Sequence, residues 1–306
     1  MNAAPDRDPF AAPRADLREL RRRLRRAVRR TRQRTDAEAI HDARVTLRRL
    51  EAALDLWGGA IPARPAQRAH RVLRRLRRAL GPAREAQVNL ALLHERAGRL
   101  PEPSRVAAAF LLERFRRRSL RRERDAAELC RRRTTDRILR RLRRVLLASQ
   151  ASPSPAPGWL EGARLRASGR LAEAREALRG ALDAPDDETL HRARIAVKRS
   201  RYLLERLAAA GGGPEVHALA GLRTYQELLG SIHDLAVAHE RLLRDVRRLA
   251  AVDPAAASTV DPIAEMLEVE RDAALRSLRT LAHESPRTDL LRVVETSPPR
   301  EQSAGS

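Results

Sequence analysis

The chain has 306 residues, of which 42% are hydrophobic and only 2% aromatic, and it carries a formal charge of +23 from 63 basic and 40 acidic side chains. It is long enough for two ordinary domains, its one cysteine excludes an intramolecular disulfide, and no run of about 18 apolar residues predicts a membrane span. Because Ala, Leu, Arg and Glu dominate and no stretch alternates apolar with polar residues, the sequence predicts an all-α protein.

The compartment is predicted from the first residues of the chain and from its cysteine. The segment MNAAPDRDPFAAP contains acids and lacks the apolar core of a signal peptide. The single cysteine, Cys130, suits a reducing environment. We therefore expect a cytoplasmic protein that does not enter a membrane.

The helical period is plain along the first half of the chain. Apolar residues recur at spacings of three and four in 17–28 and in 40–57, as in amphipathic helices. Thr35 and Glu38 form a capping-box pattern that predicts the start of the second helix. Further helices are expected up to about Leu80, from Gly81-Pro82 to about Leu100, and over 103–148 with an interruption near Thr134-Thr135.

A Pro/Ser/Gly-rich segment, SQASPSPAPG, divides the chain almost in half and predicts an extended linker. After it a helix is expected near 160–182, and Pro185-Asp186-Asp187 predicts the cap of a helix that carries His191. A Gly-Gly-Gly-Pro turn at 211–214 closes that helix. The expected organisation is a helical bundle at 14–148, a linker at 149–158, a second bundle at 159–283, and tails at 1–13 and 284–306.

Two motifs occur once in each half, in the same order. The segment HDARVTLRRLEAALDLW starts at His41, and HRARIAVKRSRYLLERL starts at His191. A Leu-Gly pair follows each, with Gly81 lying 40 residues after His41 and Gly230 lying 39 residues after His191. Such self-similarity indicates a tandem duplication. Two similar antiparallel helical bundles would most simply pack about a pseudo-twofold axis, as in a symmetric dimer.

Each copy of the first motif places cationic and apolar side chains on different sides of its helix. At 100° per residue, His41, Arg44 and Arg48 fall within about 60° of one another and well away from the apolar stripe. The second copy repeats the pattern with His191, Arg194, Lys198 and Tyr202. A histidine taken alone can equally have a structural role. A merely solvated face, however, has no reason to keep the order of His, Arg and a further basic residue in both copies.

The positive charge is concentrated in the first half. Residues 1–150 hold 41 basic and 17 acidic side chains, whereas residues 151–306 hold 22 and 23. Arginine rows of this kind are usually solvated faces, yet like charges one turn apart repel, and an anionic partner would relieve the repulsion. One row follows the first helix, where Asp16 and Glu19 are expected to point elsewhere, and another follows the third. The candidate anion-binding residues in these rows are Arg18, Arg22, Arg25, Arg29, Arg75 and Arg78.

The motifs resemble those of the CHAD family, the conserved-histidine α-helical domain. HDARVTLRRLEAAL and HRARIAVKRSRYLLE are similar to its two His-x-x-Arg helices, and LGPAREAQV and LGSIHDLAV to its two Leu-Gly-x-x-Arg/His-Asp turns. The resemblance covers residues 14–283. It implies paired helical bundles about a pseudo-twofold and a basic central cavity that binds inorganic polyphosphate, and it adds Arg49 and Arg199 to the site residues. Glu85 replaces the usual Asp of the first turn and Gln87 an acid, so a salt bridge there is expected to differ.

The expected function is non-enzymatic binding of polyphosphate, with polyphosphate granules as the expected place in the cell. A polymer without bases needs dense arginine and no stacking platform, which suits a chain with seven aromatic residues. A nucleic-acid-binding basic protein is the alternative, although the chain has no helix-turn-helix, zinc or RNA-binding signature.

Enzyme and metal chemistry are not expected. CHAD domains often accompany a CYTH triphosphatase domain, but Glu268-Val269-Glu270, the nearest approach to its Glu-x-Glu-x-Lys strand motif, lies in a helical pattern without the Lys. No cofactor is expected. A metal at His41 and His191 is disfavoured because their neighbours are arginines rather than carboxylates or thiolates.

Two expectations follow for experiments. Protonated His41 and His191 would favour phosphate, so binding is expected to be tighter at mildly acidic pH. On charge distribution alone, reversing Arg22 and Arg25 to Glu is expected to weaken capture more than reversing any two basic residues after position 151.

Overall fold

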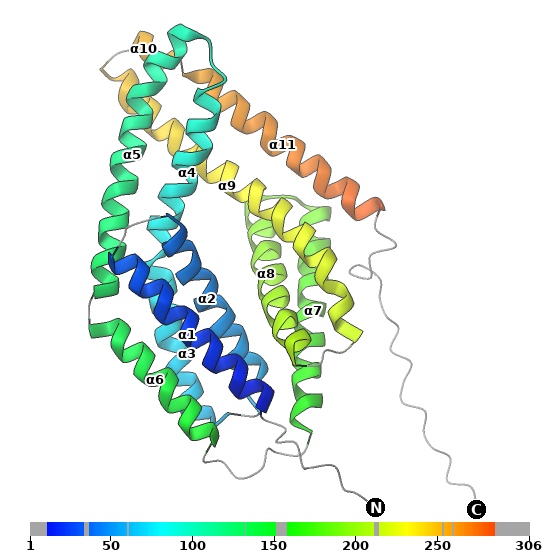
Figure 1. The fold of residues 1–306 in the computed structure, drawn as a ribbon. Coiled ribbons are helices and arrows are strands. Elements are labelled where there is room, and N and C mark those ends of the chain that lie inside the picture. The colour runs from blue at the N-terminus through cyan, green and yellow to red at the C-terminus, as the bar shows by residue number, and fades with distance from the viewer. Residues whose placement is uncertain are drawn as a thin grey trace, which may run out of the picture.

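The computed structural model describes residues 11–33, 37–59, 61–131, 133–150, 158–210, 214–252, 254–258 and 260–284. Every regular element within those ranges is helical, which confirms the all-α prediction (Figure 1). The helices of the first half are α1 (Ala11–Gln33), α2 (Ala37–Leu56), α3 (Ala63–Ala79), α4 (Gly81–Ala97), α5 (Glu102–Arg131) and α6 (Arg133–Gln150). Those of the second half are α7 (Trp159–Asp183), α8 (Asp187–Ala209), the 3-10 helix η1 (Pro214–Ala218), α9 (Leu219–Ala250), α10 (Pro254–Ser258) and α11 (Asp261–Glu284).

The predicted start of the helix that carries His191 is confirmed. Asp186 is the N-cap of α8, and its carboxylate accepts a hydrogen bond of 2.7 Å from the backbone N–H of Thr189. This bond satisfies one of the amide donors that the first turn of a helix leaves without a partner. The capping-box pattern at Thr35 falls outside the described residues, as do residues 1–10 and 285–306 of the predicted tails and 151–157 of the predicted linker. The remaining parts of the tails and linker differ from the prediction, because residues 11–13 belong to α1, residues 149–150 to α6 and Glu284 to α11.

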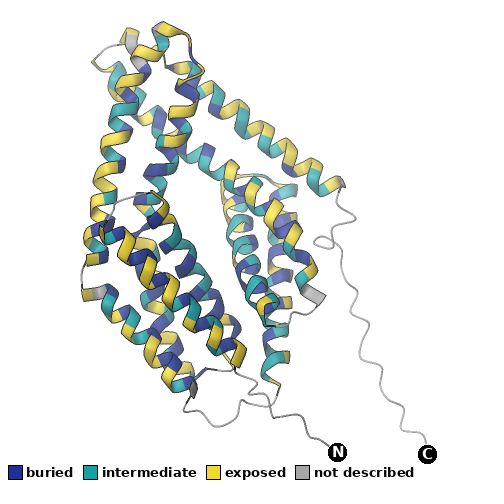
Figure 2. Cartoon of the chain, in the orientation of Figure 1, coloured by how far each residue is buried: buried dark blue, intermediate teal, exposed yellow. Residues whose placement is uncertain are grey.

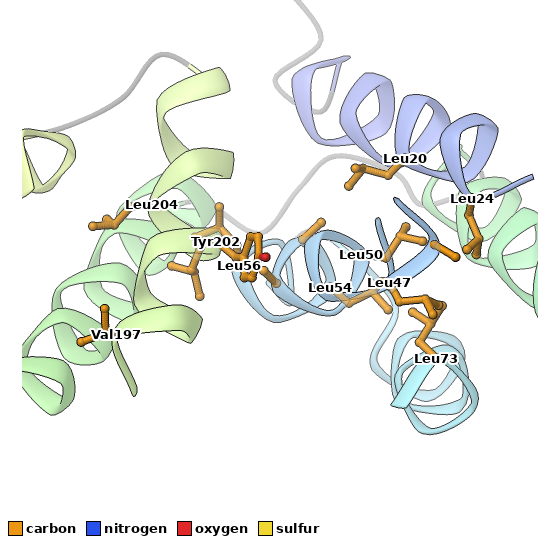
Figure 3. Packing of buried hydrophobic residues seen from close by; sticks show 14 of the residues in the cluster. Leu20, Leu24, Leu47, Leu50, Leu54, Leu56, Leu73, Val197, Tyr202 and Leu204 are labelled. Carbon is orange, nitrogen blue, oxygen red and sulfur yellow. The ribbon is translucent and has the colours of Figure 1, made fainter. Parts of the chain in front are cut away.

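A first hydrophobic core joins α1, α2, α3 and α6 with α7, α8 and the first half of α9. Figure 3 shows Leu47 and Leu50 of α2 between α1, which contributes Leu20 and Leu24, and α3, which contributes Leu73. Leucines at this helical spacing are the apolar stripe that the sequence predicts. Figure 2 shows the same alternation along the helices, with buried residues on the sides that face each other and exposed residues outside.

A second core lies farther along the molecule and also draws on both halves of the chain. It contains Leu93 of α4, Phe115 of α5, Leu242 of α9 and Leu267 of α11. In Figure 1 the α4–α5 hairpin stands beside the C-terminal part of α9 and the start of α11. The long helix α9 therefore contributes to both cores.

The duplicated Leu-Gly pair has a different local structure in its two copies. In the first copy α3 ends at Ala79 and α4 begins at Gly81, whereas in the second copy Gly230 lies inside the uninterrupted helix α9. The difference has a simple cause, because Pro82 follows Gly81 and lacks the backbone N–H that would continue the helix, while Ser231 follows Gly230. The sequence predicts this break correctly.

The helices that carry equivalent motifs contact one another. Helix α2 packs on α8, and α4 packs on α9. Each contact joins one copy of a repeated motif to its counterpart, which is the arrangement that a twofold axis between the copies would produce. The predicted pseudo-twofold repeat is compatible with this packing. Within the described ranges, no helix combines the length and apolar character needed to cross a membrane.

Candidate functional site

The cationic sides of α2 and α8 face a cavity of about 810 Å³, which α4 and α9 complete. Each side chain reaches the cavity because the opposite side of its helix is held in the first core, as Val197 and Leu204 are on α8 (Figure 3). The basic residues of the lining, with the two histidines, are His41, Arg44, Arg48, Arg49, Arg78, Arg84, Arg194, Lys198, Arg201 and His233.

Most of the residues predicted from the duplicated motif meet at this cavity. Arg48, Arg194, Lys198 and Tyr202 also line a second cavity of about 330 Å³, which α3 and α7 complete and to which Arg199 contributes. The two hollows therefore lie on either side of the same four side chains. The predicted residues that line the larger one are His41, Arg44, Arg48, Arg49, Arg78, Arg194, Lys198 and Tyr202.

His191 lies just outside this cavity rather than within it. It lines a neighbouring hollow of about 460 Å³, together with the acidic residues Asp187, Glu188 and Glu240. His233 lines both that hollow and the cavity, and its ring centroid is 5.6 Å from that of His191. The two copies of the motif are thus unequal in this respect, because His41 faces the arginines and His191 lies beside carboxylates.

The arginine row of α1 lies outside the cavity. Its members Arg18, Arg22, Arg25 and Arg29 are exposed, as is Arg75 of α3, and none of the five lines either hollow. The expectation that Glu19 points away from the row is wrong. Glu19 forms an ion pair of 3.0 Å with Arg22 and others with Arg23 and Arg26, because residues three and four apart share a side of the helix.

Sequence reasoning missed six titratable residues of the site, of which Glu85 and Glu227 are two. Arg84 and Arg201 line the cavity, and so do His233 and Asp234. A signal for three of them existed, because Arg84, His233 and Asp234 occupy the turns that follow the Leu-Gly pairs, at corresponding positions of the repeat. Arg201 carried no such signal, since its counterpart in the first copy is Glu51.

On the α2 side, Arg44 is held in place by α3. Its Nη1 donates a hydrogen bond of 2.8 Å to the backbone carbonyl of Arg77, whose own Nε donates to Glu51 at 3.0 Å. Arg44 also lies against Gly81, where an added Cβ would be in ordinary van der Waals contact with Nη1 of Arg44, at 3.4 Å. Burial and the neighbouring guanidinium of Arg48 lower the pKa of Arg44 to about 10. Arg44 therefore stays charged at neutral pH while its surroundings favour an incoming anion.

On the α8 side, the acid Asp234 lies close to Arg194 and to the amine of Lys198. Asp234 pairs with Arg194 at 3.8 Å. Lys198 forms no ion pair with any described residue, and burial together with Arg48 and Arg194 lowers its pKa to about 6. Burial and Arg194 also lower the pKa of His233, to about 4. The free cavity therefore holds neutral bases that an anion would help to protonate.

One edge of the site is rigid because its cations are fixed by protein partners. Arg201 donates to the side-chain oxygen of Gln226 at 2.7 Å and pairs with Glu205 one turn along α8. Its guanidinium lies 4.3 Å from the ring centroid of Tyr202, a cation–π contact. Arg49 also approaches Glu205, at 3.7 Å. These bonds position the buried ring of Tyr202 between the two hollows.

The positions that depart from the family pattern have partners on other helices. Glu85 pairs with Arg241 of α9, and the side-chain N–H of Gln87 donates to Glu123 of α5 at 3.0 Å. Arg84 keeps a cavity position, and burial lowers its pKa while Asp234 opposes that shift. Glu85 thus forms an ion pair across α4 and α9 although it is longer than the usual Asp.

The charge of the lining is strongly unbalanced. Eight arginine and lysine side chains face three acids, which are Glu85, Glu227 and Asp234. Guanidinium groups bind phosphate oxygens in pairs, and several around one hollow suit a ligand with many negative charges. Among the described residues, no group of three or more His, Cys, Asp or Glu could hold a metal ion. The arrangement is thus suited to binding a polyanion.

The model of the CHAD domain matches residues 15–243 of the chain. The chain belongs to the CHAD family. The CHAD domain from the plant Ricinus communis has 25% sequence identity to it and a TM-score of 0.69, with 94% of this chain and 96% of that chain covered. PptA from Streptomyces chartreusis has the same fold, with 20% identity, a TM-score of 0.69, and coverage of 89% of this chain and 98% of that one. No curated protein matches the sequence.

Proposed function

We propose that this CHAD protein binds inorganic polyphosphate, without chemical change, in the cavity between α2 and α8. The observation that carries the proposal is the eight arginine and lysine side chains that face this one hollow. Membership of the CHAD family supports it, because the family resemblance implies a basic cavity for this polymer.

The ligand is expected to be a chain of phosphates rather than a nucleic acid. Proteins that bind single strands ordinarily offer aromatic side chains on which bases stack. Among the described residues, Tyr202 is the one aromatic residue besides the histidines that lines the cavity, and its ring is buried and covered by Arg201. The described lining therefore offers no exposed tyrosine, tryptophan or phenylalanine ring on which a base could stack, whereas its guanidinium groups can receive phosphate.

Competition between two polyanions tests the proposal. Long-chain polyphosphate and mixed-sequence DNA are added at equal phosphate concentration to protein carrying a labelled polyphosphate, at physiological salt. Polyphosphate is expected to displace the label at much lower concentration, and both affinities should fall with salt because bound counterions are released. Displacement by DNA at equal or lower concentration would favour the nucleic-acid alternative.

The absence of catalysis and the place in the cell belong to the same proposal. Incubation with tripolyphosphate and magnesium should release no phosphate, since the described residues offer phosphate-binding groups but no acidic cluster for the metal. A fluorescently tagged protein should collect on polyphosphate granules and become diffuse in cells that cannot make the polymer. Phosphate release in the first experiment would instead make the protein an enzyme.

A further inference from the structure

Lys198 is the only lysine of the chain, and it faces the cavity among arginines. The positive charges of Arg48 and Arg44 of α2 and of Arg194 of α8 disfavour protonation of its amine. The carboxylate of Asp234 favours protonation, but it forms its ion pair with Arg194 and not with Lys198. An amine in these surroundings has several phosphate-binding groups beside it and no carboxylate that holds it as an ammonium ion.

The amine of Lys198 is a nucleophile at neutral pH. Burial and the neighbouring cations lower its pKa to about 6, so its lone pair is free above that pH. Lysines activated in this way, by loss of solvent and by a nearby cation, form covalent bonds with carbonyl carbon. The side chain lines two adjoining hollows, which leave space for a small reagent on either side of it.

We propose that Lys198 is a site of covalent acylation by small acyl phosphates. The guanidinium groups around it would bind the phosphate of the reagent, and the carbonyl carbon joined to that phosphate would then lie next to the amine. The inference rests on the proposed anion-binding role of the cavity, but it concerns a different reagent and a covalent product.

The reaction balances without any further reactant. The lone pair of Nζ attacks the carbonyl carbon, a C–N bond forms, and the C–O bond to phosphate breaks. The amine proton leaves with the phosphate as hydrogen phosphate, and the product is a neutral amide. Arg48 and Arg194 would stabilise the negative charge that develops on the leaving phosphate, which is the usual role of arginine in phosphate chemistry.

Few other groups of the chain can compete for the reagent. Burial raises the pKa of the thiol of Cys130 to about 11, so that thiol is protonated at neutral pH. The chain's α-amino group is the remaining amine, and it serves as an internal standard within each sample. The amide at Lys198 could no longer take up a proton beside a bound phosphate and would fill part of the cavity, so acylated protein should bind polyphosphate less tightly.

The test compares two acetylating reagents on the intact protein at pH 7.5. Acetyl phosphate carries the phosphate that the arginines would recognise, whereas the N-hydroxysuccinimide ester of acetic acid does not. Peptide mapping by mass spectrometry gives the acetylation rate at Lys198 relative to the α-amino group for each reagent. We expect this relative rate to be at least about tenfold higher with acetyl phosphate than with the ester. A tenfold change corresponds to the free energy of about one charge-assisted hydrogen bond.

Two variants separate phosphate recognition from mere nucleophilicity. Arg48→Gln should remove most of the preference for acetyl phosphate, because Arg48 lines both hollows next to Lys198. Arg75→Gln should leave it unchanged, because Arg75 is exposed on α3 and lines neither. Orthophosphate should slow acetylation by acetyl phosphate and not by the ester.

Three outcomes would overturn the inference. They are an equal preference for the two reagents at Lys198, an equal effect of Arg48→Gln on both, or no acetylation of Lys198. A protein that binds polyphosphate but shows one of these outcomes would refute only this inference. A protein that is acetylated at Lys198 by acetyl phosphate but does not bind polyphosphate would refute the proposed function instead.

Discussion

Arg206 of α8 donates a hydrogen bond to Asp16 of α1, with 2.8 Å between Nη1 and Oδ1, and so joins residues that lie 190 positions apart. The same carboxylate accepts a bond of 3.2 Å from Nε1 of Trp57, which directly follows α2. Because α2 and α8 form opposite sides of the cavity, one carboxylate connects both sides to α1. The two side chains are largely buried, with 11% of Asp16 and 16% of Arg206 exposed.

Asp16→Asn is therefore expected to lower the free energy of unfolding by roughly 2 kcal/mol, the size of hydrogen bonds to a charged group. Chemical denaturation measures the change. Asp42→Asn is the matched control, because Asp42 also pairs with an arginine, Arg30, but is 45% exposed. That substitution should cost less than about 0.5 kcal/mol. Similar losses from both variants would show that the Asp16 contact does not hold the helices together.

Arg78 and Arg75 lie one turn apart on α3, and both are exposed, but only Arg78 lines the cavity. Arg78→Gln should weaken polyphosphate binding by about 1.5 kcal/mol or more, since it removes a charge-assisted contact. Arg75→Gln should change it by much less. Titration of both variants with labelled polyphosphate makes the comparison. Equal losses would indicate that binding follows the net charge of the surface and not the cavity.

Charge reversal separates the cavity from the row on α1. The distribution of charge along the sequence predicts the larger loss for Arg22→Glu with Arg25→Glu. The positions of the side chains predict the larger loss for Arg194→Glu with Lys198→Glu, because only the second pair lines the cavity. The first pair should mainly slow association at low salt. Rates and affinities measured at two salt concentrations decide between these expectations.

Binding of polyphosphate should take up protons near pH 7.5. Free Lys198, with its pKa of about 6, is mostly neutral at that pH, and a bound phosphate raises the pKa and returns the proton. The affinity should therefore fall as the pH rises above 6. His41, whose pKa is lowered by burial and by Arg84, adds to the same trend.

Calorimetric titration in two buffers of different ionisation enthalpy measures the protons taken up. Lys198→Met should remove most of the uptake near pH 7.5, where a histidine with a lowered pKa contributes less. Unchanged uptake in this variant would assign the pH dependence to the histidines, as the sequence alone suggests. No uptake in the unchanged protein would mean that the bound polymer does not approach the amine.

Lys198→Met should also stabilise the free protein in a pH-dependent way. Burial and Arg48 lower the pKa of Lys198 from 10.5 to about 6, so the unfolded chain binds the proton more tightly than the folded one. Lys198 therefore destabilises the folded protein increasingly as the pH falls below about 10.5. Its destabilising contribution to the free energy of unfolding reaches its full size below pH 6 or so.

The gain from Lys198→Met should consequently be large at pH 5.5 and small at pH 9.5. Denaturation curves at the two pH values measure it, and Lys198→Arg serves as a control that keeps the positive charge. That control should show no comparable gain. A gain from Lys198→Met that is independent of pH would show that the amine is not desolvated in the fold.

The helices could be predicted from the sequence because their signals are local. The expected helix at 160–182 is α7, Trp159–Asp183, and the cap at Asp186 follows from residues that are adjacent in the chain. Near the interruption expected at Thr134-Thr135, helix α5 ends at Arg131 and α6 begins at Arg133. Apolar spacing and capping residues act within one or two turns, so a single sequence contains them.

Which residues line the cavity depends on contacts between helices that are distant in the sequence, and local sequence patterns do not contain this information. Arg22 and Arg78 both belong to arginine rows, yet Arg22 pairs with Glu19 outside the cavity and Arg78 lines it. That difference arises from how α1 and α3 pack against their neighbours. The duplicated motif was a better guide, because repetition at a fixed separation marks the residues that meet when the two copies pack together. It could not show that His191 would lie in a separate hollow.

Helix α9 runs without interruption from one hydrophobic core into the other, with Leu229 and Ile232 in the first and Leu235 and Leu242 in the second. If either core loses its packing, one end of α9 loses its apolar contacts. Thermal unfolding should consequently be one cooperative transition, in which the calorimetric enthalpy equals the van't Hoff enthalpy. A fragment cut at the linker would leave apolar surface bare on both pieces, so neither should persist as a folded monomer.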